Sequence, residues 1–583
     1  MSIAKRWVLR EPKNPQAIET LKNELGVDDL IAKLLVDRGL ETFDQAKRFF
    51  RPSLDHLHDP FLMKDMDIAV NRVLKALESD EKIMIYGDYD VDGTTSVSLV
   101  YAFLSKVYKN LITYIPDRYK EGYGVSTSGI DLASAEGVGL IIALDCGIKA
   151  IEKVEYAKSK GIDFIICDHH RPGAEIPKAV AVLDPKRKDC DYPYKELSGC
   201  GVGFKLMQAL RPKIGLETQD LYKLLDLLAV SIGADIVPIT GENRILAHFG
   251  LKIINEKARP GLEALIEVSG RKKPMSITDV VFTLGPRINA AGRMDHGKKA
   301  VDLLCTLDPG EALKKAKKID ANNTRRRGVE KEILEGAVEM IHDLQEEDRK
   351  TTVLFNPEWN KGVIGIVASK LIDSYYYRPT IIFTESNGVL AASARSVYGF
   401  DVYKALEACE DLLEQFGGHM YAAGMSLKKE NFPAFKARFE EVVASTIDPE
   451  LLIPEIQIDA EIELNEITPK NQRILNQFAP FGPENMQPIF ATRNVKDNGW
   501  GKGVGEEKNH AKLCIKKGDG QDFIDAIGFF MGEAVDLAKQ GEIHICYHLE
   551  ENTWNGVTKP QLRLLDVKSA LAETSMKGSM PEK

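Results

Sequence analysis

Three aspartates that alternate along the chain are the residues best suited to carry chemistry. Asp88, Asp90 and Asp92 fall at every second position of residues 87–93, directly after the apolar run 83–86. An extended segment turns every second side chain to the same face, so the three carboxylates are expected side by side. Carboxylates held this close repel one another unless a cation lies among them. The spacing therefore predicts a cation site at the end of a buried strand.

Two other structures fit an acidic run of this length. A calcium-binding EF-hand loop requires a glutamate six residues after its glycine. The sixth residue after Gly93 is Leu99, and an apolar strand rather than a helix precedes the motif. The EF-hand is therefore excluded. A solvated acidic turn is the other alternative, and the run alone does not exclude it.

The elements that must position these aspartates form an alternating pattern of strands and helices between residues 71 and 250. Apolar strands are expected at 83–86, 111–115, 140–144, 164–167 and 179–183, with helical stretches between them. This pattern predicts a parallel sheet covered by helices on both faces. Ligands of such sheets bind outside the carboxyl ends of the strands. Polar residues follow these strands directly, so they are expected to meet at one edge: Asp145, then Asp168-His169-His170, then Asp184.

Asp235 is a further candidate, because it follows an apolar segment, 224–232, that predicts a buried helix. A charged group in such surroundings must be paired or bound to a metal. Capping of the helix and pairing with Arg244 are the alternatives to a metal.

Taken together, the sheet edge offers more carboxylates than one ion needs. Carboxylates with one or two imidazoles suit Mn²⁺ or Mg²⁺ better than zinc. Two such ions about 3.5–4 Å apart can assist an in-line phosphoryl displacement. One carboxylate should then bridge them, and Asp145, alone on a central strand, is the expected bridge. The candidate set is Asp88, Asp90, Asp92, Asp145, His169, His170 and Asp235.

The rest of the chain divides by its patterns. We expect an N-terminal helical cap at 1–70, the catalytic domain at 71–250, a helical connector at 251–349, a second α/β domain at 350–450, a β-barrel of OB type at 451–570 and a flexible tail at 571–583. In the connector, residues 285–294 predict a turn-rich segment with two arginines. One helix face there carries seven basic residues, which indicate either a polyanion track or an ordinary solvated face: Lys314, Lys315, Lys317, Lys318, Arg325, Arg326 and Arg327.

The second α/β domain and the OB region contain weaker signals. The strand expected at 389–392 runs into Ser393 and Arg395, and residues 416–419 form a Gly-Gly-His segment that suits either a phosphate-binding loop or a simple turn. OB barrels stack single-stranded nucleic acid on exposed aromatic rings. Trp500 and Trp554 are candidates for such stacking, and core packing explains either tryptophan equally well. The other stacking or backbone contacts suggested there are Lys502, His510, Lys512 and Asn555.

Composition limits the class of protein. The chain has 583 residues, 44% of them hydrophobic, and a net charge of −10, so any contact with nucleic acid must depend on local basic clusters. The eight cysteines include no C-x-x-C pair, which favours a reducing compartment. No apolar run is long enough for a membrane span, and the first residues lack a secretory signal. A cytoplasmic protein without membrane association is expected.

The motifs resemble those of a known family. Residues 88–93, Asp145, Asp168-His169-His170 and Asp235 are similar to the four motifs of the DHH phosphoesterase superfamily. Residues 285–294, Ser393-Ala394-Arg395 and 416–419 narrow the resemblance to its single-strand-specific 5′→3′ DNA exonucleases. The resemblance implies an α/β fold in which a parallel-sheet DHH domain and a DHHA1 domain are joined by long helices and followed by an OB-like β-barrel.

The resemblance also implies roles for single residues. One ion, Mn²⁺ or Mg²⁺, would be held by Asp88, Asp90 and Asp145, and a second by Asp92, Asp145, His169 and Asp235. His170 would contact the scissile phosphate or the leaving group, and this residue, Asp90, Asp92, Asp145, His169 and Asp235 would form the catalytic set. The substrate contacts implied are Arg118, Ser393 and Arg395 on the 5′-terminal phosphate, Gly417, Gly418 and His419 on the strand near the metals, and Arg287, Asn289 and Arg293 in the connector.

The implied biology is DNA repair and recombination by a monomer acting on single-stranded DNA with a 5′-phosphate. A single-strand-binding protein and a RecQ-type helicase are the partners that the resemblance implies. The chain departs from the family pattern at Cys146, where asparagine is expected, and at 231–233, which are Ser-Ile-Gly instead of Gly-Thr-Val. Two alternatives stay open: a phosphodiesterase for cyclic dinucleotides or short oligonucleotides, and a binding relative without catalysis.

Overall fold

The computed structural model describes residues 3–386, 388–516, 522–554 and 556–570, with the side chain of Trp554 left out. The tail predicted at 571–583 and Asn555 lie outside these residues. Contacts divide the chain into two compact units, which are described separately. Unit 2 contains Arg48–Gly328 and Phe478–Met486; unit 1 contains Met1–Lys47, Val329–Gln477 and Gln487–Lys583.

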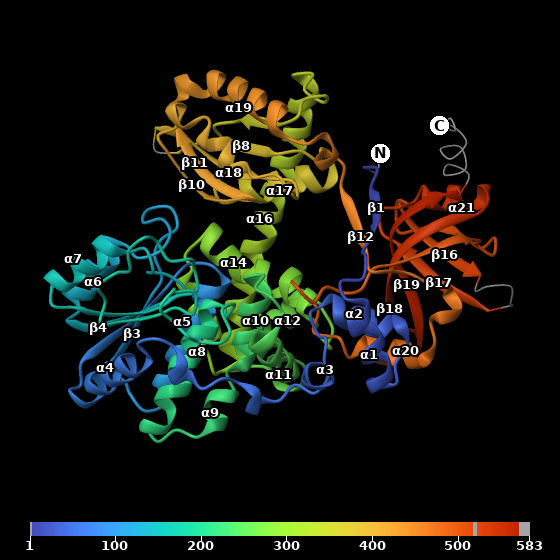
Figure 1. Cartoon of the computed structure of the whole chain (residues 1–583). Coiled ribbons are helices and arrows are strands. Elements are labelled where there is room, and N and C mark those ends of the chain that lie inside the picture. Colours follow the sequence, from blue (N-terminus) through green and yellow to red (C-terminus); the bar gives the residue numbers. More distant parts are fainter. Residues whose placement is uncertain (1–2, 387, 517–521, 555, 571–583) are drawn as a thin grey trace. The chain divides into compact units, whose positions relative to one another are not determined.

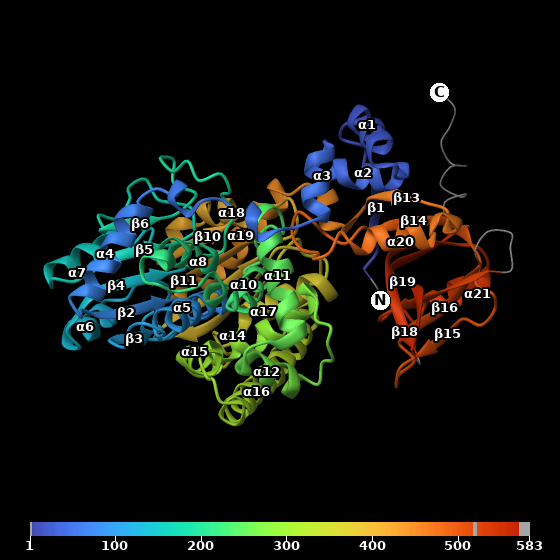
Figure 2. The ribbon, with the colours of Figure 1, turned by 90° about the horizontal axis from the view of Figure 1, so that it is seen from below.

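A five-stranded parallel sheet forms the centre of unit 2, as predicted. Its strand order is β3-β2-β4-β5-β6, so β2, which carries the first aspartate motif at its end, has a neighbour on each side. Figure 2 shows these strands side by side. The bounds are β2 (Lys82–Gly87), β3 (Leu111–Tyr114), β4 (Val138–Leu144), β5 (Asp163–Cys167) and β6 (Ala181–Leu183).

Helices cover both faces of this sheet because its strands are apolar on both sides. Ile83, Ile85 and Ile142 pack into one core with α4 (Met66–Glu78), α5 (Val91–Leu104), α8 (Gly199–Leu210) and α10 (Leu225–Ala234). Met84 and Ile141, on the alternate positions, pack with α6 (Thr127–Ala135) and α7 (Ile151–Ser159) on the other face. The carboxyl edge of the sheet is thereby left for polar residues.

The connector consists of consecutive helices, and the turn-rich segment predicted at 285–294 is wrong. These residues form α14 (Gly285–Met294), which has Pro286 in its first turn, where proline is favourable. Gly292 is needed because a Cβ there would lie 2.8 Å from the backbone oxygen of Tyr89. The neighbouring elements are α11 (Gly241–Lys257), α12 (Pro260–Ser269), α13 (Ile277–Asp279), the π-helical turn η4 (Val280–Leu284), α15 (Lys298–Leu304) and the long α16 (Pro309–Asp343).

The second α/β domain, in unit 1, contains a five-stranded sheet in the order β10-β11-β9-β8-β7 (Figure 1). Residues 416–419 were expected as a loop or turn, but they belong to edge strand β10, where they pair with β11. The bounds are β7 (Thr352–Phe355), β8 (Thr380–Ser386), β9 (Val389–Arg395), β10 (Gln415–His419), β11 (Ala422–Leu427), α17 (Ile364–Ser374), α18 (Val402–Glu407) and α19 (Phe432–Thr446).

The C-terminal part of unit 1 contains a seven-stranded sheet in the order β13-β14-β18-β19-β17-β16-β15. Trp500 is 80% exposed, so it does not pack in a core. The bounds are β13 (Ala460–Glu461), β14 (Phe490–Val495), β15 (Lys502–Val504), β16 (His510–Lys516), β17 (Phe523–Gly528), β18 (Ile543–Trp554) and β19 (Val557–Ser569), with helices α20 (Pro469–Asn476) and α21 (Ala534–Gln540).

The N-terminal segment contains a strand as well as helices. β1 (Arg6–Leu9) pairs in parallel with β12 (Glu455–Ile458), and α1 (Pro15–Leu25), α2 (Asp29–Asp37) and α3 (Phe43–Phe50) follow. The segment predicted as one cap is shared between the units, since unit 2 begins at Arg48. Among the helices of the described residues, none is both long and apolar enough to cross a bilayer.

Arg244 does not pair with Asp235. Its buried guanidinium donates to the backbone oxygens of Phe49, Phe478 and Ala479 and lies 3.7 Å from the Phe49 ring centre. These contacts tie residues 478–486 to unit 2, although the chain around them belongs to unit 1.

Replacement of Arg244 by methionine should lower the free energy of unfolding by about 2–3 kcal/mol, because several buried carbonyl oxygens lose their donor. Denaturant unfolding measures this loss. Arg271→Met is the control, since that arginine is 54% exposed and its pairing with Asp279 contributes about 1 kcal/mol or less. Equal losses in the two variants would contradict the proposed anchoring role.

Candidate functional site

The first aspartate motif bends around the start of a helix. β2 ends at Gly87 and α5 begins at Val91, so the expectation that all three carboxylates line one extended segment is wrong. Asp90 caps α5 by accepting from the backbone N–H of Gly93 at 3.0 Å. Asp92 lies in the first turn of the helix, where the backbone dipoles favour negative charge. Gly93 permits this bend, since a Cβ there would lie 2.3 Å from the backbone oxygen of Asp88.

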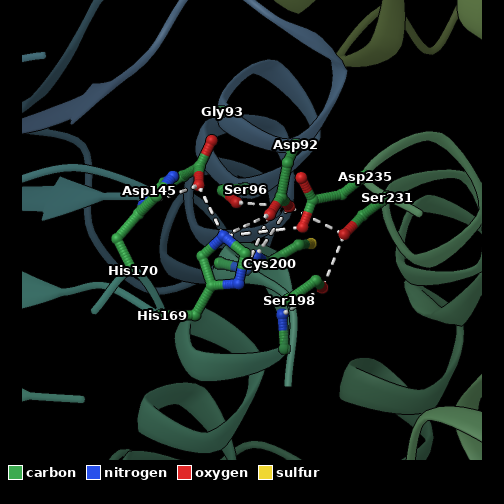
Figure 3. Close-up of polar contacts among 12 residues, drawn as sticks. Asp92, Gly93, Ser96, Asp145, His169, His170, Ser198, Cys200, Ser231 and Asp235 are labelled. Carbon is green, nitrogen blue, oxygen red and sulfur yellow. Dashed lines mark hydrogen bonds and ion pairs between the residues drawn. The ribbon is translucent and has the colours of Figure 1, made fainter. Parts of the chain in front are cut away.

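His169 is the centre of the cluster. Its Nε2 atom lies 3.2 Å from Asp145 Oδ1, 3.5 Å from Asp235 Oδ2 and 3.8 Å from Asp92 Oδ2. Figure 3 shows these four side chains pointing toward one another from β4, α10, α5 and the end of β5. Potential ligand atoms within 4.8 Å of one another form two sets: Asp145 with His169 and His170, and Asp92 with His169 and Asp235.

Asp88 and Asp90 belong to neither of these two sets. Asp88 is fully buried and accepts from the backbone N–H of Gly124 at 3.3 Å. Burial raises the pKa of Asp88 well above its ordinary value, and the charge of Asp90 adds to the rise. The two carboxylates are therefore electrostatic neighbours at the margin of the His169 cluster.

The cluster fits a divalent cation. Burial raises the pKa values of Asp145 and Asp235 well above the ordinary range, and the charges of Asp92 and Asp90 raise them further. Burial lowers the pKa of His169, which favours the neutral imidazole that binds metals. Five buried atoms of these residues have no hydrogen-bond partner: Asp88 Oδ2, Asp145 Oδ1, Asp235 Oδ2 and both ring nitrogens of His169. Buried polar atoms are rarely left so, and cations would satisfy the three carboxylate oxygens and His169 Nε2.

Asp168 fixes the direction of the two histidines. Its carboxylate accepts from the backbone N–H groups of Ile148, His169 and His170 and from Nδ1 of His170 at 2.7 Å. Although burial opposes its charge, these bonds lower the pKa of Asp168 to about 2. Burial also opposes the charge of His170, yet Asp168 raises the pKa of that histidine. Nε2 of His170 faces the Tyr123 hydroxyl at 3.0 Å, a contact that sequence patterns did not indicate.

The start of α8 is a second feature that sequence analysis missed. Asp92 Oδ2 accepts from the N–H of Gly199 at 2.6 Å, and Asp92 Oδ1 accepts from the N–H of Cys200 at 2.9 Å. A Cβ on Gly199 would lie 2.6 Å from the Cβ of Asp145. The glycine-rich run 199–203 was the available signal, since such runs at helix starts let a backbone approach closely.

The predicted substrate residues of unit 2 differ in their contacts. Arg118 places its guanidinium 4.6 Å from the Tyr89 ring centre, and its charge partly opposes the rise that burial causes in the pKa values of Asp88 and Asp90. Arg287 is paired with Asp320 at 2.8 Å. Asn289 and Arg293, also on α14, are half-buried.

The predicted residues of unit 1 share one face of the second sheet. Ser393 on β9, Gly424 on β11 and Gly417 on β10 are aligned across three strands. Arg395, Ala422 and His419 form the next such row. Residues directly opposite on neighbouring strands point to the same face. The two aligned glycines therefore leave an open floor beside Ser393, bordered by Arg395 and His419. Gly418, between the rows, is exposed.

The start of α17 lies against the same face. A Cβ on Gly365, in the first turn of α17, would lie 2.7 Å from Ser393 Oγ and 2.9 Å from a terminal nitrogen of Arg395. Arg395 donates to Ser393 Oγ at 2.9 Å and to the Ala394 carbonyl oxygen at 2.7 Å. Within the described residues no carboxylate pairs with Arg395, and burial lowers its pKa. A half-buried cation beside a helix start fits an anion.

Three family models match the chain in the order of these domains. They are the DHH family, N-terminal domain, at residues 82–232, the DHHA1 domain at 329–445 and the RecJ OB domain at 458–566. The fold and the site thus define a DHH-type phosphoesterase with an OB domain.

Comparison with single proteins identifies the family within the DHH-type phosphoesterases. The chain is 38% identical over 565 residues to the single-stranded-DNA-specific exonuclease RecJ of Bacillus subtilis, and the match covers 96% of this chain and 70% of that protein. The match to RecJ of Escherichia coli is 34% identical and covers 90% and 93% of the two chains. The chain belongs to the RecJ family of single-stranded-DNA-specific exonucleases. A role in DNA repair follows from the family.

Two solved structures support the same assignment. RecJ from Thermus thermophilus in complex with Mn²⁺ matches with a TM-score of 0.82 at 28% identity, over 100% of this chain and 80% of that one. The Mg²⁺ complex from the same organism matches with a TM-score of 0.77 at 27% identity, over 100% and 79%. The phosphodiesterase and the non-catalytic relative considered above are set aside by these matches.

Gly199→Ala should weaken Mn²⁺ binding and lower the free energy of unfolding by about 1–3 kcal/mol, because the added methyl group displaces Asp145. Isothermal titration calorimetry and denaturant unfolding measure the two effects. Gly201→Ala, two residues further along the same helix, is the control, since a Cβ there meets the Leu197 side chain at 3.3 Å. Unchanged Mn²⁺ affinity in Gly199→Ala would contradict this account of the site.

Proposed function

We propose that the chain digests single-stranded DNA from its 5′ end, with two divalent ions, Mn²⁺ or Mg²⁺, bound at the carboxyl edge of the β2–β4–β5 sheet. The observation that carries the proposal is the group of buried carboxylate and imidazole atoms without hydrogen-bond partners around His169. The Mn²⁺ and Mg²⁺ complexes of the Thermus thermophilus relative support this choice of ions.

The residues divide between the two ions as follows. Asp92, His169 and Asp235 would hold one ion, Asp88 and Asp90 would hold the other, and Asp145 would contribute to both. When bound, the ions activate a water molecule and stabilise the charge that develops on the phosphate. The proposed ligands lie at the ends of strands and helices: Asp88, Asp145 and His169 follow β2, β4 and β5, Asp90 and Asp92 lie at the start of α5, and Asp235 caps the end of α10.

His170 acts on the phosphodiester itself. Its Nδ1 atom is held by Asp168, which leaves Nε2 directed outward to the Tyr123 hydroxyl. The raised pKa of this imidazole favours its protonated form. A protonated imidazole can donate to a phosphate oxygen or to the leaving 3′ oxygen.

Digestion in one direction requires an anchor for one end of the DNA strand. Ser393 and Arg395 are proposed to bind its 5′-phosphate. The start of α17, the Ser393 hydroxyl and the guanidinium of Arg395, which has no carboxylate partner among the described residues, support this assignment. Arg118 is proposed to contribute to the same 5′-phosphate contact, Gly417, Gly418 and His419 to contact the DNA strand next to it, and Asn289 and Arg293 to contact the DNA backbone. Arg287, already paired with Asp320, would act through α14 instead.

Basic residues of α16 and an aromatic residue of the OB domain are proposed as further contacts with the DNA strand. Lys317, Lys318, Arg325 and Arg327 are exposed on α16, whereas Arg326 is buried and bonded to Asn323, so it is removed from the predicted basic face. Trp500 in the OB domain offers an exposed ring for base stacking. We propose that the chain acts in the cytoplasm on single-stranded DNA, which a single-strand-binding protein and a RecQ-type helicase would supply. We propose that one copy of the chain suffices.

Asp145→Ala should reduce cleavage of single-stranded DNA by more than about 100-fold at any Mn²⁺ concentration, because loss of the bridge affects both ions. Asp235→Ala removes a ligand of one ion, so high Mn²⁺ should restore part of its activity. The measurement is the rate of release of nucleotides as a function of Mn²⁺ concentration. Near-normal turnover of Asp145→Ala would show that the two-ion arrangement is wrong.

Arg395→Ala should slow digestion of 5′-phosphorylated strands by about 10- to 100-fold, since charge-assisted hydrogen bonds to phosphate contribute about 1.5–3 kcal/mol. Digestion of 5′-hydroxyl strands should change much less. Arg438→Ala, an exposed arginine of the same domain paired with Asp411, is the control. Equal losses on both substrates would remove Arg395 from end recognition, and digestion from the 3′ end would overturn the polarity.

A further inference from the structure

Asp92 accepts more hydrogen bonds than Asp145 and Asp235, the other two carboxylates that face His169 Nε2. Two come from the N–H groups of Gly199 and Cys200 at the start of α8. A third comes from the Ser231 hydroxyl, which lies 2.7 Å from Asp92 Oδ1, and a longer one from the Ser96 hydroxyl at 3.5 Å (Figure 3). Both Asp92 and Ser231 are buried. Asp145 Oδ1 and Asp235 Oδ2, by contrast, have no hydrogen-bond partner.

The direction of each hydrogen in this network is determined. An ionised carboxylate only accepts, so Ser231 donates its single hydroxyl hydrogen to Asp92. Ser198 Oγ lies 2.7 Å from Ser231 Oγ and must therefore donate to it. Ser198 in turn accepts from the N–H of Gly201 at 3.1 Å, as the N-cap of α8. The chain of donors thus runs from the backbone of α8 through two serines to Asp92.

Ser231 also sets the position of Asp235. The two residues are four apart on α10, hence on the same face of that helix. The N–H of Asp235 donates to the Ser231 carbonyl oxygen at 2.9 Å. One residue of α10 therefore contacts Asp92 on α5 through its hydroxyl and Asp235 through its backbone. These two carboxylates, with His169, form one of the two candidate ligand sets.

We propose that Ser231 is a positioning residue of the metal centre: its hydroxyl joins α10 to α5 and fixes the Asp92 carboxylate, and thereby the spacing of Asp92 and Asp235. It touches neither substrate nor metal. The inference rests on the proposed function, in which Asp92 and Asp235 bind the same ion. Outer hydrogen bonds of this kind typically change metal affinity about 10- to 100-fold.

The test is Mn²⁺ binding in the absence of DNA, followed by isothermal titration calorimetry and by electron paramagnetic resonance of free Mn²⁺. Ser231→Ala and Ser231→Gly should each weaken one of the binding events about 10- to 100-fold. Ser231→Thr, which retains a hydroxyl, should recover most of the affinity. Ser98→Ala is the matched control, since that serine is buried on α5 but bonds only the Thr94 carbonyl oxygen.

Measurements in an Asp92→Ala protein distinguish a failure of this inference from a failure of the proposed function. In an Asp92→Ala protein, the further change Ser231→Ala should have no effect on Mn²⁺ affinity, because the hydroxyl has lost its acceptor. If Ser231→Ala binds Mn²⁺ as the unaltered protein does while Asp92→Ala does not, the positioning role is wrong and the metal assignment stands. If Asp92→Ala leaves Mn²⁺ binding unchanged, the ligand assignment itself fails.

Discussion

Mutual repulsion among buried carboxylates is the constraint on which the catalytic unit depends. Asp88, Asp92 and Asp145 are almost fully buried at one edge of a sheet, and their charges raise the pKa values of their neighbours. The parallel topology partly offsets this cost, because α5 and α8 both begin at that edge with their positive dipole ends toward the carboxylates. Asp168 forms four hydrogen bonds and needs no cation. Asp88, Asp145 and Asp235 each retain a buried oxygen without a hydrogen-bond partner, and all three are proposed to bind metal.

The second sheet, in unit 1, is proposed to recognise one end of the DNA strand. A metal centre acts on any phosphodiester and cannot distinguish the two ends of a strand. The open floor made by Gly417 and Gly424, next to Ser393 and Arg395, offers a cation without a carboxylate partner within the described residues. An arginine fork and a helix start match the additional oxygens of a terminal phosphate. Under the proposed function, cleavage and end recognition therefore belong to separate sheets.

Sequence analysis could predict the parallel sheet and most of the cluster, because apolar strands ending in Asp or His are local patterns. It failed where contacts between distant segments decide the structure. Residues 285–294 form a helix that packs at Gly292 against Tyr89, far earlier in the chain. Arg326 appeared to be part of a basic face, yet it turns inward to Asn323. Ser231 was visible only as a departure from a motif, and its partner Asp92 lies on another helix.

The hydrogen bonds of the two central carboxylates also bear on how they divide the ions. A carboxylate has about four lone-pair sites. On Asp92, Gly199, Cys200 and Ser231 occupy three of them and the Ser96 hydroxyl lies 3.5 Å from Oδ1, which leaves room for one ion at most. Asp145 Oδ1 accepts no hydrogen bond and lies within 4.0 Å of both His169 and His170. Asp145 therefore retains the free lone pairs that a bridge between two ions requires, and Asp92 does not. This difference supports the proposal that Asp145 serves both ions and Asp92 only one.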